Sequence, residues 1–455
     1  MKIGPKTLRA AYCMSVVSAD MEDRPLKSEQ DLEMEPKADQ DELALESQVL
    51  SRRSFVGVSA LAGASLFASN AVAQTRKEQL AGRAGKNMTN PGPENKTLLG
   101  LNPSSNDPPF TDHGNPGPIW YSFDLAPKRM QGGGWTHQVT QRELPSSRDI
   151  AGVNMRLTSG SFRELHWHTA DEWAIMLTGT ARISLMQLDG KMFLDDVEAG
   201  DIWYFPAGMP HSIQGLGTDG CEFLLVFDEG AFSEDDTFLL SEFLAHTAPD
   251  LVQKNMGWSR EVFDQLPPTE LYIFQAPLPG SLEEDKKFLG EHLETENKYT
   301  FKMASMAPTQ KTAGGETRVV DSSNFPVAKN IAASMVTLRP GAIREMHWHP
   351  TTNEWQYWIR GKGRMTVVTT NAKARTMDFN PNDVGYVPSM AGHIIENTGT
   401  EDLVFLEMFK SARYQDISLN QWIARMPKAM AEAHLKLNEA TIRKAPQGNN
   451  GVLPK

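Results

Sequence analysis

The chain has 455 residues, of which 22% are charged and 40% hydrophobic, and its formal net charge is -12. These proportions are ordinary for a globular protein, so they exclude a chain disordered throughout, a collagen and a polytopic membrane protein. The acidic balance lacks the clustered basic surface that nucleic acid requires, and we expect no nucleic-acid partner. Two cysteines, Cys13 and Cys221, are too few for a disulfide framework or a thiolate zinc site.

Residues 1–73 carry the pattern of an export signal. Arg52 and Arg53 form a twin-arginine pair, an uncharged run rich in Ala, Gly and Ser covers 54–75, and Ala71-Val72-Ala73 is a small-x-small cleavage pattern. Together they predict a twin-arginine signal and a periplasmic or secreted protein with no stable membrane association after cleavage. The alternative is a transmembrane anchor, because the run is long enough to span a bilayer. Its serine and asparagine content argues against that.

Residues 74–120 are rich in Pro, Gly and Asn and predict an extended arm. The sequence after the arm contains one pattern twice, at an offset of 181 to 182 residues. The first copy reads Gly160-x5-His166-x-His168-x3-Glu172, then Gly200-Asp-Ile-Trp-Tyr-Phe-Pro206 and His211. The second reads Gly341-x5-His347-x-His349-x4-Glu354, then Asn382-Asp-Val-Gly-Tyr-Val-Pro388 and His393. Two coincidences of this length indicate a duplicated domain.

Within each copy, short apolar segments alternate with turn residues, which is typical of β-strands in a sandwich or barrel. The strands expected from this pattern cover residues 181–188, 202–205, 222–227, 365–369 and 403–409. Each copy closes with a helix-like segment, at 240–257 and at 421–440.

The repeated histidines predict two metal sites. Two histidines at positions i and i+2 of a strand point to the same face, so both rings can reach one ion. A glutamate on the next strand and a third histidine on a separate hairpin complete each set. The predicted ligands are His166, His168, Glu172 and His211 in the first copy, and His347, His349, Glu354 and His393 in the second. Satisfied core or surface histidines are the alternative, but six of the eleven histidines fall into this repeated pattern. Iron, manganese, zinc and nickel all fit, and the carboxylate favours a harder ion such as manganese.

These two blocks resemble the two motifs of the cupin superfamily, and the duplication resembles a bicupin. Several segments are closer to the bacterial and fungal oxalate decarboxylases: Arg163-Glu-Leu-His166-Trp-His168, Arg344-Glu-Met-His347-Trp-His349-Pro, Pro210-His211-Ser-Ile-Gln, Glu354-Trp-Gln-Tyr and Ser418-Leu-Asn-Gln-Trp422. The sequence departs from the general cupin pattern at Gly215, where the pattern has Asn, and at Asn382 and Met390, where it has Gly.

The resemblance implies an all-β fold with flanking helices, in which two cupin domains are each a double-stranded β-helix or jelly roll. Cupin domain 1 is expected at 121–290 with a lid loop at 228–239. Cupin domain 2 is expected at 291–440 with C-terminal helices, followed by a tail at 441–455. By the same resemblance the protein forms a homo-hexamer, a dimer of trimers, with the arm packing across domains.

The activity implied by the resemblance is conversion of oxalate to formate and carbon dioxide, with two manganese ions per chain and dioxygen as co-catalyst. Arg163 would hold oxalate, and Glu234 in the lid segment Ser233-Glu-Asp-Asp-Thr237 would shuttle the proton. The alternative for Arg163 is a structural ion pair with a neighbouring acid such as Glu164, and the alternative for Glu234 is an acidic loop that is merely solvated.

Arg344 repeats Arg163 in the second copy, and Glu407 lies where the repeat places Leu225. Both are candidate catalytic residues. A carboxylate there could shuttle protons, or it could pair with Arg344 in a structural or electronic role, which we favour. The first-copy site is the expected catalytic site because it has both Arg163 and Glu234. The rival enzyme is an oxalate oxidase, which gives carbon dioxide and hydrogen peroxide. A non-catalytic storage or binding bicupin is the other rival, but such proteins commonly lack full ligand sets.

Overall fold

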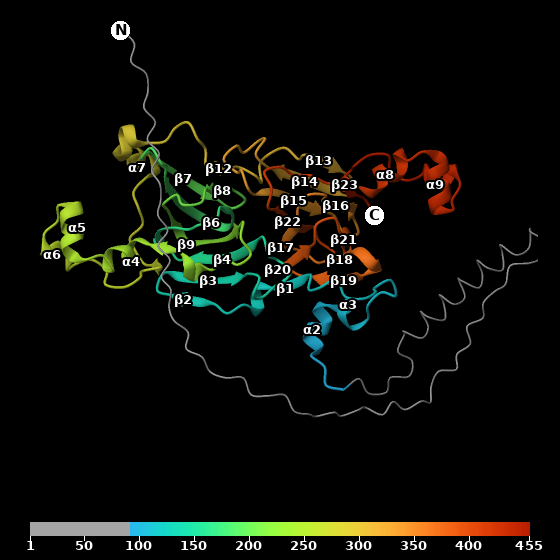
Figure 1. Ribbon diagram of the computed structural model, residues 1–455, viewed down its shortest axis with the longest axis horizontal. Helices are drawn as coiled ribbons and strands as arrows, with labels where there is room; N and C mark the ends of the chain where they lie inside the picture. Colours follow the sequence, from blue (N-terminus) through green and yellow to red (C-terminus); the bar gives the residue numbers. More distant parts are fainter. Residues whose placement is uncertain (1–91) are drawn as a thin grey trace, which may run out of the picture. The chain divides into compact units, whose positions relative to one another are not determined.

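The fold was analysed in a computed structural model that describes residues 92–455. The predicted export signal, residues 1–73, and residues 74–91 of the predicted arm lie outside the described residues. Within 92–455, β-sheets dominate and helices flank them, as expected from the sequence (Figure 1). No helix in this part of the chain has the length and apolar character needed to cross a membrane.

Domain 1 is one eleven-stranded antiparallel sheet, with seven strands in the order β12-β8-β6-β9-β4-β3-β2. Of the other four, β5 pairs with β9, β10 and β11 pair with β5, and β7 pairs with β6. Its two long strands, β6 and β9, pair from Glu172 to Leu185, and the register shifts near Gly179. The strands are β2 (Arg129–Gln131), β3 (Gly134–Val139), β4 (Ala151–Leu157), β5 (Phe162–Trp167), β6 (Glu172–Met186), β7 (Met192–Glu198), β8 (Ile202–Phe205), β9 (His211–Phe227), β10 (Phe238–Leu239), β11 (Ile273–Phe274) and β12 (Thr300–Phe301).

Domain 2 repeats this plan as a seven-stranded and a six-stranded sheet. The two sheets separate because the counterparts of β6 and β9 are each interrupted and counted as two strands. The strands are β1 (Trp120–Ser122), β13 (Gln310–Thr312), β14 (Gly315–Val320), β15 (Ala332–Leu338), β16 (Ile343–Trp348), β17 (Glu354–Arg360), β18 (Gly363–Val368), β19 (Ala374–Phe379), β20 (Asp383–Val387), β21 (Gly392–Asn397), β22 (Leu403–Phe409), β23 (Ile417–Ser418) and β24 (Val452–Leu453).

The two domains exchange strands, which moves both predicted boundaries. Strand β1 precedes domain 1 in sequence but pairs with β20 of domain 2, and β12 follows domain 1 but pairs with β8. A shared core of buried side chains joins the domains, including Trp173, Trp355 and Tyr386. The strand pairing therefore crosses the predicted boundaries near residues 120 and 290.

Helices cover the ends of the sheets and differ in detail from the prediction. The α-helices are α2 (Lys96–Leu101), α3 (Pro103–Asn106), α4 (Leu240–Ala245), α5 (Pro249–Met256), α6 (Arg260–Phe263), α7 (Leu282–Leu289), α8 (Leu419–Arg425), α9 (Lys428–Leu435) and α10 (Glu439–Ile442). The predicted helix 240–257 is α4 and α5, and the predicted helix 421–440 is α8, α9 and the start of α10. Pro249 and Pro427 stand at the first break of each, because proline cannot continue a helix.

The arm and the tail both pack on domain 2. The described part of the arm is not wholly extended, since it contains α2 and α3. The Ser104 amide donates to Asp378 at 2.7 Å, and His113 forms a bridge with Ala374. Residues 441–455, predicted as a tail, belong to domain 2 because β24 pairs with β16.

The sequence departures at Asn382 and Met390 keep the turns of the first copy. Gly200 and Gly208 have φ values of 88° and 76°, and Asn382 and Met390, their counterparts, have 72° and 64°. Asparagine tolerates this left-handed region, whereas methionine is strained there. Both turns are preserved, so the hairpin that carries each third histidine keeps its shape.

Candidate active site

In domain 1, three strand ends bring the four predicted ligands together as site 1, which consists of His166, His168, Glu172 and His211. Strand β5 carries the first histidine, the second follows its end, and β6 and β9 begin at the glutamate and at the third histidine. Glu172 Oε2 lies 3.3 Å from His168 Nε2 and 3.6 Å from His211 Nε2. One ligand atom from each residue lies within 4.8 Å of all the others, and all four residues are buried.

The rings of site 1 are oriented by the backbone. The Nδ1 atoms of His166, His168 and His211 lie 2.5, 2.7 and 2.8 Å from carbonyl oxygens, which leaves each Nε2 facing the centre. Burial and the positive charge of Arg163 hold the pKa of His166 well below its ordinary value, so this imidazole is neutral and can bind a metal. Burial works to raise the pKa of Glu172, but the neighbouring imidazoles of His168 and His211 lower it to about 2. Trp203 Nε1 donates to Glu172 Oε1 at 3.0 Å.

Domain 2 holds the equivalent site 2, which consists of His347, His349, Glu354 and His393. Glu354 Oε2 lies 2.9 Å from the Nε2 atoms of both His349 and His393. These atoms and His347 Nε2 are buried without a hydrogen-bond partner. Buried polar atoms that converge on one point without partners are costly unless a cation satisfies them. The donor sets of both sites, three imidazoles and a carboxylate, therefore fit a divalent transition metal.

In domain 1, Arg163 and Glu234 meet in the interior beside site 1. Arg163 Nη2 donates to Glu234 Oε2 at 3.0 Å and to Thr237 Oγ1 at 3.1 Å, and both charged side chains are at most 5% exposed. The Nε and Nη1 atoms of Arg163 are buried without a partner. The ion pair of Arg163 is with Glu234 and not with Glu164, whose carboxylate accepts from the amides of Ser241, Leu271 and Tyr272.

In domain 2, Arg344 is fully engaged. It donates to Glu407 Oε1 at 3.0 Å, to the Gly451 carbonyl at 3.1 Å, to Tyr414 at 2.6 Å and to Asp416 at 3.0 Å. Glu407 keeps one buried oxygen, Oε2, without a partner. The pairing of Glu407 with Arg344 was one of the alternatives raised by the sequence. Together, these four contacts give every guanidinium nitrogen of Arg344 a partner, so none is left free for a carboxylate ligand.

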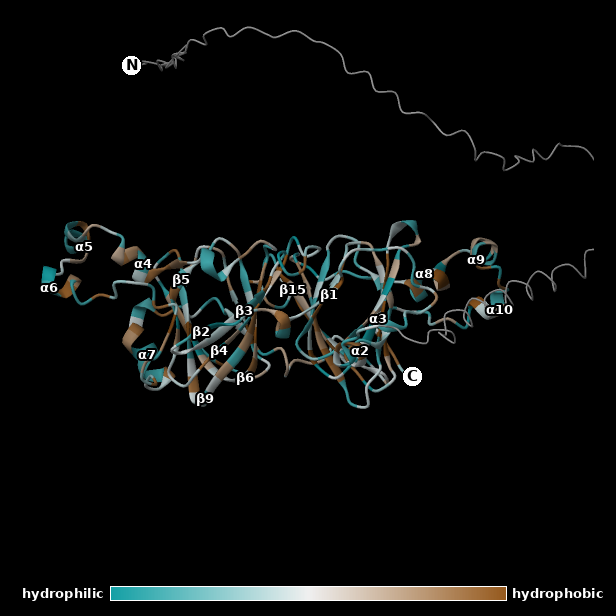
Figure 2. Ribbon diagram, turned by 90° about the horizontal axis from the view of Figure 1, so that it is seen from below, coloured by the Kyte–Doolittle hydropathy of each residue, from teal (hydrophilic) through white to brown (hydrophobic). Residues whose placement is uncertain are grey.

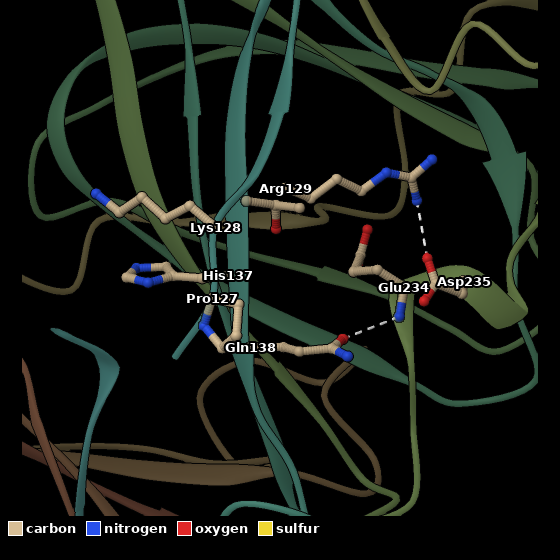
Figure 3. Close-up of a pocket in the computed structure, with 8 residues that line it drawn as sticks. Pro127, Lys128, Arg129, His137, Gln138, Glu234 and Asp235 are labelled. Carbon is tan, nitrogen blue, oxygen red and sulfur yellow. Dashed lines mark hydrogen bonds and ion pairs between the residues drawn. The ribbon is translucent and has the colours of Figure 1, made fainter. Parts of the chain in front are cut away.

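The loop at 228–239 lies beside site 1, where the Phe232 ring packs against His168 with ring centroids 5.5 Å apart. It contains a short 3-10 turn, Glu234–Asp236. It then forms strand β10, which pairs with β5. The Glu234 amide donates to Gln138 Oε1 at 3.1 Å, and a cavity of about 240 Å³ lies between this turn, β2 and β3 (Figure 3). Glu234 is 5% exposed, which corrects the alternative that it is merely solvated. Asp235 and Asp236 are exposed, as that alternative expected.

Sequence reasoning missed several residues that hold these groups. Tyr272 donates its hydroxyl to Glu234 Oε2 at 3.0 Å and has a φ of 50°. Arg129 lies over the Tyr272 ring at 3.7 Å. Neither residue belongs to a repeated motif, so no pattern in the sequence marks them. Tyr414 and Asp416 lie just after a predicted strand, and only their proximity to Arg344 in space reveals their role.

Two duplicated β-domains, each with three histidines and one glutamate at its centre, define a metal-binding bicupin. The Cupin family model matches residues 123–263 and 301–443. Oxalate decarboxylase OxdC of Bacillus subtilis is 47% identical over 357 residues, covering 78% of this chain and 92% of that protein. A probable oxalate decarboxylase of Arthroderma benhamiae is 40% identical over 359 residues, covering 78% of this chain and 88% of that protein.

Solved structures agree with the sequence comparison. A structure of Bacillus subtilis oxalate decarboxylase, determined in a study of its Mn(II) centres, has a TM-score of 0.79 and 46% identity and covers 81% of this chain and 97% of its own. The chain therefore belongs to the cupin family and, within it, to the oxalate decarboxylases, which are carboxy-lyases.

Proposed function

We propose that the protein converts oxalate to formate and carbon dioxide at site 1. The observation that carries this proposal is the contrast between the two arginines. Arg163 is buried with two nitrogens free and lies against the buried Glu234, whereas Arg344 has partners for all of its nitrogens. Site 1 thus combines an anion-binding group with a proton-carrying group. Site 2 holds its arginine in a structural network.

The cofactor in this proposal is manganese, one ion in each site, with dioxygen as co-catalyst. The three imidazoles and one carboxylate of each site would be its ligands, and a harder ion suits the carboxylate. When bound, manganese together with dioxygen would supply the reversible one-electron oxidation that makes oxalate labile. The Mn(II) centres of the related Bacillus subtilis oxalate decarboxylase support this choice.

Arg163 binds and orients the substrate in this mechanism. Its Nε and Nη1 atoms are free, and a forked pair of charge-assisted hydrogen bonds to one carboxylate of oxalate uses one of them together with Nη2, which in the structure holds Glu234. Such pairs are strong in a buried, water-poor site, and they fix the dicarboxylate relative to the ligands of site 1. The loop 228–239 acts as a lid that keeps water from the reacting carbon.

Glu234 moves the proton. As a carboxylate it accepts the proton of bound oxalate, and after carbon dioxide leaves it returns that proton to the carbon of the product, which gives formate. Its contacts with Arg163 and Tyr272 hold the carboxyl group inside the closed lid. Glu407 and Arg344 stabilise domain 2 and its metal ligands instead of acting on substrate.

The variant Glu234→Gln tests the proposal because it keeps the size of the side chain and removes its basicity. We expect formate production to fall by about 100-fold or more, in line with the loss of a general base. Peroxide becomes the main product, as in an oxidase, because the radical is no longer protonated. Asp236→Asn, a matched change at an exposed lid position, keeps the wild-type products. If Glu234→Gln makes formate at the wild-type rate, Glu234 is not the proton carrier.

A second proposal concerns assembly, and its occupant is another copy of this chain. The helices α4–α6 and α8–α10 project at opposite ends of the described part (Figure 2). Exposed apolar side chains lie on both, including Phe243, Leu251, Trp422 and Met430. Because the two ends derive from one repeat but differ in sequence, a contact between them is head-to-tail, and such contacts form a ring when the rotation between copies closes. This supports trimers that pair into a hexamer, and light scattering that gives a monomer would contradict it.

Export through the twin-arginine signal remains a further proposal.

A further inference from the structure

The closed lid has two kinds of anchor, one inside the site and one outside it. Inside, Glu234 contacts Arg163 and Tyr272. Outside, Asp235 Oδ1 lies 2.9 Å from Arg129 Nη1, and Figure 3 shows this arginine reaching the turn from β2. Asp236 has no ion pair within residues 92–455, although it is exposed and carries the same charge.

Arg129 is held in place by residues outside the lid loop 228–239. Its Nη2 donates to Glu270 Oε1 at 2.6 Å, and its guanidinium lies 3.7 Å from the centroid of the Tyr272 ring. Its side chain is only 29% exposed, whereas Asp235 is 70% exposed. A guanidinium fixed by a carboxylate and an aromatic face loses little further freedom when it binds a second carboxylate. The partner that moves is therefore Asp235, on the lid.

The outer anchor matters most when substrate is bound. Arg163 donates to Glu234 in the structure, and the same guanidinium is the group proposed to hold oxalate. Once oxalate takes up Arg163 and Glu234 turns towards the substrate, the inner ion pair no longer secures the loop. The Arg129–Asp235 pair does not take part in that exchange. It can keep the lid closed while the proton is transferred.

We propose that Arg129 and Asp235 are positioning residues that latch the lid and thereby keep Glu234 over the reacting carbon. This inference rests on the proposed function, since it assigns a purpose to lid closure. Because the pair is partly exposed, its contribution is modest and is screened by salt, unlike the buried Arg163–Glu234 pair. Ionic strength then shifts the balance between open and closed lids, and with it the balance between formate and peroxide.

The test compares Asp235→Asn with Asp236→Asn in the manganese-loaded full chain, since both remove one negative charge from the same turn. Hydrogen exchange of the peptide covering 228–239 is measured at low salt and at about 0.5 M salt, where screening lengths are a few ångströms. At low salt we expect Asp235→Asn to speed exchange of the lid amides roughly two- to fivefold, as for an exposed ion pair, and Asp236→Asn to leave it unchanged. High salt brings the wild type to the level of Asp235→Asn.

Product analysis on the same samples links the latch to chemistry. The ratio of peroxide to formate should rise by a similar factor in Asp235→Asn, and Asp235→Glu should restore part of the loss. Equal exchange in the two asparagine variants overturns the latch. Faster exchange with an unchanged product ratio overturns the positioning role. If the wild type itself makes no formate, the proposed function fails while the exchange data still decide whether the latch exists.

Discussion

At the scale of single residues, the two related arginines behave differently because of their neighbours. Both are about 1% exposed and each lies three residues before a metal-site histidine. Arg344 is surrounded by Glu407, Tyr414 and Asp416, whereas Arg163 contacts Glu234, Thr237 and the face of the Tyr272 ring. The arginine of domain 2 therefore has a partner for every guanidinium nitrogen, whereas in domain 1 the Nε and Nη1 atoms of the arginine have none.

Arg163→Lys tests the binding role because it keeps the charge and removes the planar, forked donor set. We expect kcat/KM for oxalate to fall by at least about 30-fold, which equals about 2 kcal/mol of lost interaction with a buried charge. Steady-state kinetics checks this. Arg182→Lys is the matched control, since Arg182 is a buried arginine paired with Asp196 and Asp285 outside the site. Equal losses in the two variants would show that the effect is structural.

Asp416 gives domain 2 a stability that depends on pH. Burial works to raise its pKa, but the charge of Arg344 and three hydrogen bonds hold the pKa below its ordinary value. A carboxyl group with a lower pKa in the folded state stabilises the protein above its unfolded pKa of about 3.9, and this stabilisation is lost as the pH falls through the lower folded value.

Asp416→Asn should therefore lower the free energy of unfolding at pH 7 by roughly 1.5–3 kcal/mol, the range for hydrogen bonds to charged groups. Below about pH 4 the difference from the wild type should shrink. Urea unfolding at several pH values measures it. A difference that stays constant down to the lowest pH at which the protein is folded would mean that the ionised form of Asp416 is not what stabilises the domain.

At the scale of elements, the chain end is part of the second domain. Strand β24 pairs with β16, Val452 is 1% exposed, and the amides of Asn450 and Gly451 donate to Glu345 at 2.9 Å. These contacts hold the strand that carries His347. The end of the chain thus supports site 2 although it lies about a hundred residues away in sequence.

Deletion of residues 448–455 removes these contacts. We expect a loss of at least about 3 kcal/mol in the stability of domain 2. The deletion removes the buried side chain of Val452 and two hydrogen bonds to the Glu345 carboxylate. Calorimetry measures this loss. Deletion of only residues 454–455, both exposed, is the control and should have little effect. Similar melting of both truncated chains would contradict the role of β24.

The repeat made much of this fold predictable, because the histidine motifs fix the strands on which they lie. The predicted strands 202–205 and 403–409 match β8 and β22. Pro249 and Pro427, which split the closing helices, are visible in the sequence, although the prediction ran both helices through them. The exchange of β1 and β12 could not be read from the sequence, since short edge strands carry no signal for which sheet they join. Tyr272 and Arg129 were also hidden, because their proximity to Glu234 is purely three-dimensional.

At the scale of the whole molecule, the duplication has produced two similar metal sites with different surroundings. A shared core and exchanged strands join the domains, so each supports the other. Within residues 92–455, only domain 1 combines an arginine that has two unpartnered nitrogens, a buried glutamate paired with it and the loop 228–239 beside its predicted metal ligands. This difference between the two sites predicts one catalytically active site per chain.

The most direct test of the central claim is product stoichiometry. Oxalate is added to the manganese-loaded protein and to the same protein after chelation, and formate and hydrogen peroxide are both quantified. The account predicts about one formate per oxalate with little peroxide from the loaded protein, since Glu234 returns the proton, and no turnover from the chelated protein. Peroxide as the main product, or neither product with manganese bound, would contradict it.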